Sequence, residues 1–314
     1  MKTVITGALG HIGSRLIREL PSAFPGGEII MLDNLSTQRY CSLFDLPREN
    51  NYRFIEADIL DYDLTPLFRG ADVVIHLAGI TNAEGSFAIR DQVEEVNFKG
   101  TERVARACVE AGCAMIFPST TSVYGTQAAL VDENCPITEL KPQSPYAESK
   151  LKAEDLLCQL GQEAGLRYLI CRFGTICGVS PGIRFHTAVN KFCWQAVMGQ
   201  PLTVWRTALH QKRPYLSLSD AVQALKFIAR NEFYDNRVYN VVTDNLTPAD
   251  LIRMIEAHVG RLAIQYTDAQ IMNMLSYEVS NRRFSERGFS FSGSIEKDIA
   301  ETISLLRAGG RRNG

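Results

Sequence analysis

Tyr146 and Lys150 are the two side chains of this sequence best suited to proton transfer. They lie in an apparently helical stretch, where a spacing of four residues puts the phenol and the ammonium on one face, about one turn apart. A free phenol has a pKa of about 10 and is a poor base at neutral pH. A neighbouring ammonium favours the phenolate and depresses this pKa. Because such pairs also occur on helices by chance, the assignment needs further support.

Hydroxyl side chains gather where a predicted strand ends, in the segment FPSTTSVYG at residues 117–125. The carboxyl edge of a parallel sheet is where ligands of doubly wound folds bind. Ser119 or Thr120 is therefore placed to hydrogen-bond a substrate oxygen while Tyr146 moves its proton.

A glycine-rich turn, TGALGHIG at residues 6–13, follows an apolar strand and opens a helix. Gly7 permits the tight turn, Gly10 lets the backbone approach a pyrophosphate, and Gly13 lets the helix pack close to the sheet. The free N–H groups and partial positive charge of the helix N-terminus suit phosphates. This pattern predicts a dinucleotide site.

Acidic residues end the next two predicted strands. Asp33 is placed to accept hydrogen bonds from the adenosine ribose and to repel a 2′-phosphate, which favours NAD over NADP. Asp58 is placed to reach the adenine amino group, although a surface turn residue is the alternative. His11 and Arg15 would supply positive charge nearby. His76, which precedes small residues ending at Gly79, is expected to be a packed residue and not a catalyst.

Short apolar runs alternate with helical patterns along most of the chain. The expected strands are Thr3–Thr6, Glu28–Leu32, Arg53–Glu56, Asp72–Leu77, Ala114–Pro118, Tyr168–Phe173 and Val238–Val242. The expected helices include Phe98–Ala111, Tyr146–Leu160, Pro248–Val259 and Ile295–Leu306. Near-continuous apolar runs suit a parallel sheet covered on both faces. The pattern predicts an α/β fold with a doubly wound, Rossmann-type parallel sheet and a smaller C-terminal substrate-binding lobe.

The regular alternation fades after about Gly174, which sets the expected domain boundary. Residues 1–177 are assigned to the NAD-binding domain, with a returning strand near 238–242. Residues 178–314 are assigned mainly to the smaller lobe. The last residues, 308–314, are expected to fray.

Composition excludes several classes of protein. A net charge of −2 over 314 residues does not fit a nucleic-acid protein, which usually carries a basic stripe. No apolar run approaches the roughly 20 residues of a membrane helix, and the apolar strand that starts at Thr3 leaves no room for a signal peptide, so a cytoplasmic location is expected. Eight scattered cysteines lack metal-site spacing, so no metal is expected and they are interpreted as small buried hydrophobes.

Together these motifs resemble the extended short-chain dehydrogenase/reductase superfamily, in its NAD-dependent nucleotide-sugar epimerase/dehydratase branch. The resemblance runs from Lys2 to about Leu306. The motifs that carry it are TGxxGxxG, the acids at 33 and 58, HLAG, NxxGT at 97–101, STxxVYG and SPYxxxK.

The resemblance implies a mechanism. Tyr146 as phenolate removes a sugar hydroxyl proton while hydride passes to NAD, giving a 4-keto intermediate. Lys150, with the positive nicotinamide ring, lowers the tyrosine pKa and binds the nicotinamide ribose, and Thr120 shares the hydroxyl's hydrogen bond. Asn97 supports the cofactor crevice, or equally is a local helix N-cap.

The expected ligand-binding residues follow from the motifs and their neighbours. The cofactor-binding set is Gly7, Gly10, His11, Ile12, Gly13, Asp33, Asn34, Asp58, Ile59, Leu77, Ala78, Gly79, Asn97, Ser119, Tyr146, Lys150 and Phe173. The substrate-binding set is Thr81, Ser119, Thr120, Thr121, Thr175, Arg184 and Arg213.

Several positions depart from the family pattern. Thr121-Ser122 stands where 4,6-dehydratases carry an Asp-Glu pair, and hydroxyls cannot supply that acid and base. Arg213 matches the arginine that clamps the nucleotide diphosphate through its planar fork. The second such arginine is missing from 268–277, and Arg184 is its candidate substitute. Thr175 replaces an asparagine that contacts the substrate phosphate in many members.

Three aromatic residues are potential nucleobase platforms, but packing in the core is favoured for Phe185, Trp194 and Trp205.

The leading hypothesis is a nucleotide-sugar epimerase acting at carbon 4, with a nucleotide-diphosphate sugar as substrate. A 4-ketosugar reductase or related dehydrogenase is the nearest alternative, a 4,6-dehydratase is less favoured, and a non-catalytic dinucleotide sensor is the remote non-enzyme alternative. A homodimer through the helices at 98–111 and 146–160 is expected, as is usual in this superfamily.

Overall fold

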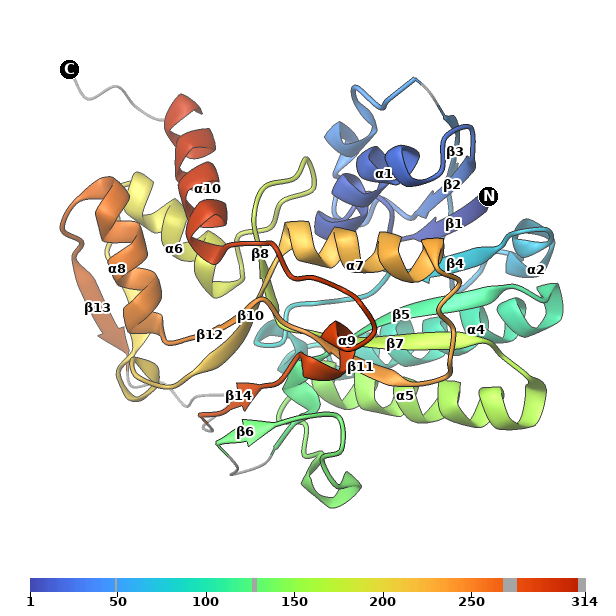
Figure 1. The fold of residues 1–314 in the computed structure, drawn as a ribbon. Helices are drawn as coiled ribbons and strands as arrows, with labels where there is room; N and C mark the ends of the chain where they lie inside the picture. The colour runs from blue at the N-terminus through green and yellow to red at the C-terminus, as the bar shows by residue number, and fades with distance from the viewer. Residues whose placement is uncertain (49, 126–128, 268–275, 310–314) are drawn as a thin grey trace.

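The central element is a seven-stranded parallel sheet with strand order β11-β7-β5-β4-β1-β2-β3. The computed structural model describes residues 1–48, 50–125, 129–267 and 276–309 (Figure 1). The strands are β1 (Lys2–Thr6), β2 (Glu28–Asp33), β3 (Asn51–Glu56), β4 (Val73–His76), β5 (Ala114–Thr120), β7 (Tyr168–Phe173) and β11 (Val238–Val241). All seven predicted strands are confirmed, with ends that differ by at most two residues. The doubly wound α/β prediction is therefore correct.

Helices cover both faces of this sheet (Figure 1). One face carries α1 (His11–Ala23) and α7 (Leu218–Arg230), whose apolar side chains join a common core with the sheet. The other face carries α2 (Leu64–Phe68), α4 (Gly100–Ala111) and α5 (Pro145–Ala164). Because strands buried on both faces need apolar side chains in both directions, their continuous hydrophobic runs are explained.

The start of α5 is fixed by local sequence. The Ser144 hydroxyl caps the helix by accepting a hydrogen bond from the Ala147 amide at 3.2 Å, and Pro145 occupies the first helical position. At the other end Gly165 adopts the left-handed conformation, with φ of 70°. These signals place Tyr146 in the first turn of the helix.

The helix predicted at 98–111 begins earlier than expected. Helix α3 (Arg90–Val93) runs into the π-helical turn η3 (Glu94–Lys99), which continues into α4 and ends at Gly112 in the left-handed conformation. Single π turns inside helices are frequent at functional sites. Asn97 lies in this turn.

A smaller lobe follows the sheet along the chain (Figure 1). Its core lies among α6 (Ala188–Val197), α8 (Pro248–Val259), α10 (Ile295–Gly309), β9 (Leu202–Trp205) and β13 (Ile264–Thr267). Strands β8 (Thr175–Cys177), β10 (Arg213–Ser217) and β12 (Asp244–Leu246) form a sheet that joins it to the central domain. The remaining elements are β6 (Leu130–Val131), β14 (Glu278–Val279), α9 (Arg282–Ser285), and the short helices Tyr40–Leu43, Gly85–Phe87, Thr121–Val123, Ile137–Glu139 and Arg206–Ala208.

The domain boundary expected at residue 177 needs correction. Besides β11, helix α7 packs on α1, and Phe284 and Phe289 pack in the same core of the nucleotide-binding domain. The chain thus returns to the first domain twice after residue 178. The cysteine interpretation also holds only in part, because five of the eight are buried while Cys41 and Cys158 are exposed.

Asp298 on α10 gives a test of how the lobe is packed. Its side chain accepts a hydrogen bond from the Cys177 thiol at 3.6 Å, and burial raises its pKa to about 6. Because the folded-state pKa lies above the unfolded value of 3.8, folding favours the protonated carboxyl. Stability is therefore lost as the pH rises from about 4 through about 6.

We expect Asp298→Asn to increase the free energy of unfolding by about 1–3 kcal/mol at pH 8 and to have little effect at pH 4. Thermal unfolding across this range measures the difference, and Glu163→Gln, an exposed change on α5, is the control. A gain that does not depend on pH would contradict the assignment.

Candidate active site

Lys150 is buried at the carboxyl end of β5, although it carries an ammonium. Its Nζ donates a hydrogen bond to the Pro118 carbonyl at 2.9 Å and lies 4.4 Å from the centre of the Phe117 ring. Burial lowers the pKa of Lys150 to about 8, while the carboxylate of Glu154 opposes this shift. The pKa of Lys150 therefore lies close to neutral pH, so a bound ligand can change the protonation of this side chain.

Tyr146 lies one turn before Lys150, and both line one cavity. Burial raises the pKa of the Tyr146 phenol, whereas the charge of Arg184 and a hydrogen bond with Thr120 lower it. The net shift in the protein alone is upward, opposite to the expectation that Lys150 depresses it. Arg184, and not Lys150, is the protein cation that acts most strongly on the phenol.

The hydroxyls at the end of β5 and in the turn that follows have different partners. Thr120 forms a hydrogen bond with Tyr146, while the Ser119 hydroxyl donates a hydrogen bond to the Glu154 carboxylate. The Thr121 hydroxyl donates to the Phe173 carbonyl at 3.3 Å, and Ser122 lines the cavity in its place. The expectation that Thr121 faces the substrate is therefore wrong, because the turn alternates the direction of its side chains.

The glycine turn fits a dinucleotide. A Cβ at Gly7 would lie 2.5 Å from the Ala78 amide nitrogen, and one at Gly13 would lie 2.5 Å from the Ala8 carbonyl oxygen. Both glycines are required for the backbone to pack this closely. Gly10 precedes α1 without a capping side chain, so the amides of the first turn are left for an anion. These residues suit the pyrophosphate of NAD.

Asp33 is oriented by two backbone amides, those of Leu9 and Leu35, each at 3.0 Å. Asn34 donates a hydrogen bond to Asp58 at 2.7 Å, and Asp58 also accepts from the Leu60 amide. The two predicted acids and Asn34 therefore lie together at the carboxyl ends of β2 and β3.

The cations expected beside this site are not those that the structure provides. His11 turns toward the Gly178 carbonyl at 2.8 Å, and burial lowers its pKa to about 3, so it is uncharged. Arg15 pairs with Glu19 at 2.6 Å. Arg39 lies beside Asp33 and the glycine turn instead. Arg39 lies in an irregular loop, and no sequence motif predicts its place beside the glycine turn.

Two other predicted residues support the crevice. His76 is fully buried between the hydroxyls of Thr6 and Thr101 at 2.7 and 3.0 Å, and burial lowers its pKa to about 3. It is a packed residue, as expected. Asn97 bonds both backbone groups of Ile80 at 2.7 and 2.9 Å and thereby braces the loop after β4. The alternative role as a helix N-cap is excluded, because Asn97 lies within a continuous helix.

The predicted residues surround a cavity of about 520 Å³ between the sheet edge and the smaller lobe. Those that line it are Ile12, Leu77, Thr81, Ser119, Thr120, Tyr146, Lys150, Phe173, Thr175, Arg184 and Arg213. Ala78 and Gly79 adjoin it through the loop after β4, whereas Ile59 packs in the core against Gly100. Lining residues that the sequence did not single out are Glu84, Ser122, His186 and Lys191.

Arg184 is a cation of the cavity whose charge acts on the Tyr146 phenol. It donates a hydrogen bond to the Thr81 hydroxyl. Within the described residues, its buried Nε has no hydrogen-bond partner. His186 beside it stays neutral, because burial and the charge of Arg184 lower its pKa to about 4. The guanidinium therefore has donor capacity left for an anionic group of a ligand.

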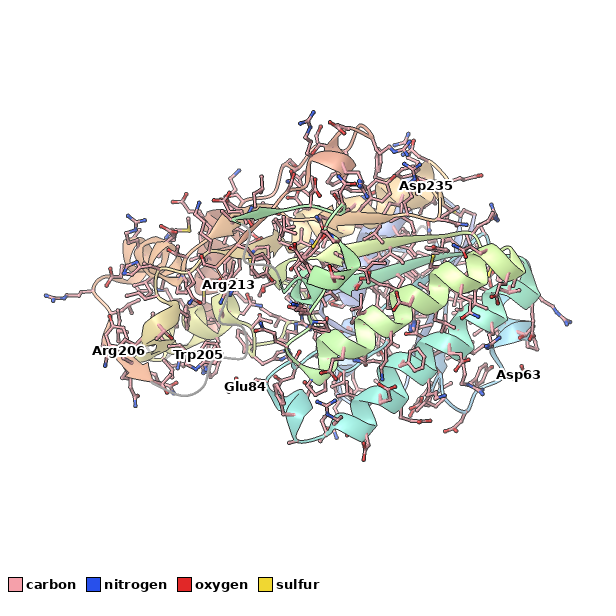
Figure 2. The ribbon with its side chains drawn as sticks, turned by 90° about the horizontal axis from the view of Figure 1, so that it is seen from below. Asp63, Glu84, Trp205, Arg206, Arg213 and Asp235 are labelled. Carbon is pink, nitrogen blue, oxygen red and sulfur yellow. The ribbon has the colours of Figure 1, made fainter. Side chains whose placement is uncertain are left out.

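Arg213 enters the cavity from β10, where its side chain contacts the Gln211 side chain at 2.8 Å. Figure 2 shows Trp205 on the smaller lobe, with Arg213 nearer the central sheet. Trp205 lines the cavity, and Trp194 is 39% exposed beside Phe185. None of these three aromatics is fully buried, so the expectation that they belong to the core is wrong.

Two further classes of site are absent from the part of the chain that the structure describes. It contains no group of His, Cys, Asp or Glu side chains that could hold a metal ion. None of its helices is long and apolar enough to cross a membrane.

Comparison with known proteins agrees with this site. The sequence model of the NAD dependent epimerase/dehydratase family matches residues 3–241. A Bacillus subtilis (strain 168) protein named uncharacterized UDP-glucose epimerase YtcB is 30% identical over 272 residues, which cover 84% of each chain.

Solved structures extend the similarity over the whole fold. MoeE5 in complex with UDP-glucuronic acid and NAD is 26% identical, with a TM-score of 0.85 over 98% of this chain and 100% of that one. The UDP-glucuronic acid 4-epimerase of Bacillus cereus, in complex with the same two ligands, is 25% identical, with a TM-score of 0.85 over 98% and 99%. This chain is an enzyme with NAD as its cofactor and belongs to the NAD-dependent epimerase/dehydratase family.

Proposed function

We propose that the protein is a UDP-sugar 4-epimerase that keeps its NAD bound through the reaction. The observation that carries this proposal is the Tyr146 phenol, which bonds with Thr120 in a cavity that adjoins the dinucleotide site. The similarity to UDP-sugar epimerases that hold NAD supports it.

In this mechanism Tyr146 is the base and Thr120 positions the reacting hydroxyl. The phenolate takes the proton of the sugar hydroxyl at carbon 4, and later returns it. Bound NAD supplies the hydride acceptor, and its positive ring favours the phenolate. Arg184 is the protein cation that favours the phenolate, and we infer that Lys150 binds the nicotinamide ribose. Rotation of the keto sugar between the two transfers inverts carbon 4.

Arg184 favours a sugar that carries a carboxylate. It acts on the Tyr146 phenol, it lines the cavity, and its buried Nε has no hydrogen-bond partner within the described residues. A guanidinium matches a carboxylate at two points. Thr175 and Ser122 line the same cavity and offer further hydroxyls. We therefore assign Arg184 to the carbon-6 carboxylate of a UDP-hexuronic acid, and Arg213 to the diphosphate.

The alternatives on this scaffold remain distinguishable. A 4-ketosugar reductase would consume NADH at every turnover, whereas an epimerase would not. A 4,6-dehydratase is disfavoured, because Thr121 points away from the cavity and Ser122 is no acid. A 4-keto hexuronate is also a β-keto acid, so a decarboxylase would release carbon dioxide and a pentose product.

Replacement of Tyr146 tests the proton transfer. We expect Tyr146→Phe to lower turnover by about 10²–10⁴-fold, because the general base is lost. NAD affinity and the thermal midpoint should hardly change, since one oxygen is removed. Thr120→Ala should reduce turnover less, and Lys150→Ala should reduce both turnover and NAD affinity. A folded Tyr146→Phe enzyme that retains more than about a tenth of the rate would contradict the role.

Arg184→Met tests the substrate assignment. We expect the wild type to prefer UDP-glucuronic acid over UDP-glucose, as ranked by kcat/KM. The substitution should reduce this preference about 30- to 100-fold, because it leaves a carboxylate without its charged partner. The preference, and not the rate alone, is measured, since Arg184 also affects Tyr146. Lys191→Met, at the same cavity, is the control. An unchanged preference would refute the assignment.

We also propose a cytoplasmic homodimer in carbohydrate biosynthesis. Helices α4 and α5 lie side by side across one face of the sheet (Figure 2) and are the expected contact. Light scattering at micromolar concentration should give twice the mass of 35.0 kDa. A monomer mass would refute the dimer.

A further inference from the structure

Glu154 and Arg172 form a buried ion pair one helical turn beyond Lys150. The side chains are 5% and 6% exposed. Arg172 Nε lies 3.1 Å from both carboxylate oxygens, and its terminal nitrogen lies 2.6 Å from Oε2. Glu154 follows Lys150 by four residues on α5, and Arg172 comes from β7, which pairs with β5. The pair therefore lies next to Lys150, one helical turn further along α5.

Hydrogen bonds connect this pair to the reaction centre. Ser119, which lines the cavity, donates its hydroxyl proton to Glu154. The neighbouring Pro118 carbonyl accepts the hydrogen bond of Lys150. Both contacts are made at the carboxyl end of β5, directly before Thr120. A change at Glu154 would thus act on the backbone that directly precedes the Thr120 hydroxyl.

The charged and titratable groups around Lys150 are few. Tyr146 and Glu154 face it from α5, neutral His76 from β4, and Arg172 lies behind Glu154 on β7. Glu154 is the anion that acts on the ammonium. Because Arg172 pairs with Glu154 at 2.6 Å, its charge opposes that of the carboxylate, and the field at Lys150 depends on both partners.

We propose that Glu154 and Arg172 are positioning residues for Lys150: the Glu154 carboxylate faces the ammonium, Arg172 fixes that carboxylate, and Ser119 ties the pair to the end of β5. A purely structural role is the alternative. Well-packed apolar residues would serve stability equally well, since a buried ion pair pays a large desolvation penalty. The pair contacts the cavity through Ser119, so its charges act at the reaction centre as well as in the packing of the core.

Single charge removals on the two partners separate these explanations. Glu154→Gln leaves Arg172 uncompensated and should lower the pH at which Lys150 loses its proton by about one unit or more. Arg172→Gln leaves Glu154 uncompensated and should raise that pH by a similar amount. A structural role predicts a loss of stability in both variants, but no shifts of opposite sign.

The titration is read by ¹⁵N NMR of lysine Nζ in protein without sugar substrate, with Lys150→Gln to assign the resonance. The titration is repeated in the presence of NAD. The affinity for NAD should follow the fraction of Lys150 that is protonated at each pH. Because neither readout needs turnover, the inference can fail while the proposed function, on which its purpose rests, stands. Shifts of the same sign, or none above about 0.3 units, would overturn it.

The double variant Glu154→Gln/Arg172→Gln keeps the test decisive if a single variant does not fold. It restores the charge balance with two amides that can hydrogen-bond each other. Lys150 should then titrate within about 0.5 units of the wild type. Glu148→Gln, also on α5, breaks an exposed pair with Arg90 of α3 and should leave the Lys150 titration unchanged. A double variant displaced by a unit or more would refute charge balance.

Discussion

Confinement of the Lys150 ammonium at the end of a buried strand is the constraint on which the rest of the site depends. A buried cation must find oxygen atoms or anions, and here it finds the Pro118 carbonyl and the field of Glu154. The backbone before Thr120 must therefore follow one path, and α5 must begin at Ser144 for Lys150 to reach it. Tyr146 is then carried to the cavity on the preceding turn.

Three arginines lie around the cavity and the glycine turn. Arg39 adjoins the glycine turn, Arg213 enters the cavity from β10, and Arg184 acts on the phenol. Burial lowers the pKa of His11, and desolvation together with the charge of Arg184 lowers the pKa of the more exposed His186, so both are uncharged at neutral pH. Beside the lysines of the cavity, the fixed positive charge is therefore carried by arginines, whose charge does not change with pH and whose geometry suits phosphate and carboxylate oxygens.

Local rules explain what could be predicted from the sequence. The inner strands are predicted from continuous apolar runs because both of their faces are buried, whereas β3 lies at the edge of the sheet and is partly exposed. Tyr146 and Lys150 are paired because helical spacing is local. Ser122 is not predicted as a lining residue, since the direction of a side chain in a short turn depends on backbone angles that no pattern encodes. Arg39 lies in an irregular loop and Trp205 ends β9, and tertiary contacts decide where both side chains lie.

The buried ion pair of Glu154 and Arg172 does carry a signal in the sequence. Arg172 is a charged residue inside an otherwise apolar strand, and Glu154 continues the spacing of Tyr146 and Lys150 by one more turn. Such a combination indicates a buried ion pair. Residues 218–230 fall within the range assigned mainly to the smaller lobe, yet α7 packs on α1. The apolar face of α7 fits either core, and only the return of β11 to the sheet brings α7 back onto α1.

The central claim is inversion at carbon 4 by hydride that leaves and returns within one closed site. The most direct measurement is NMR of the products formed from UDP-glucuronic acid in deuterated water. We expect the 4-epimer, with protium retained at carbons 4 and 5, and no net change in NADH. Deuterium at either carbon, release of a pentose, or NADH formed in proportion to product would contradict it.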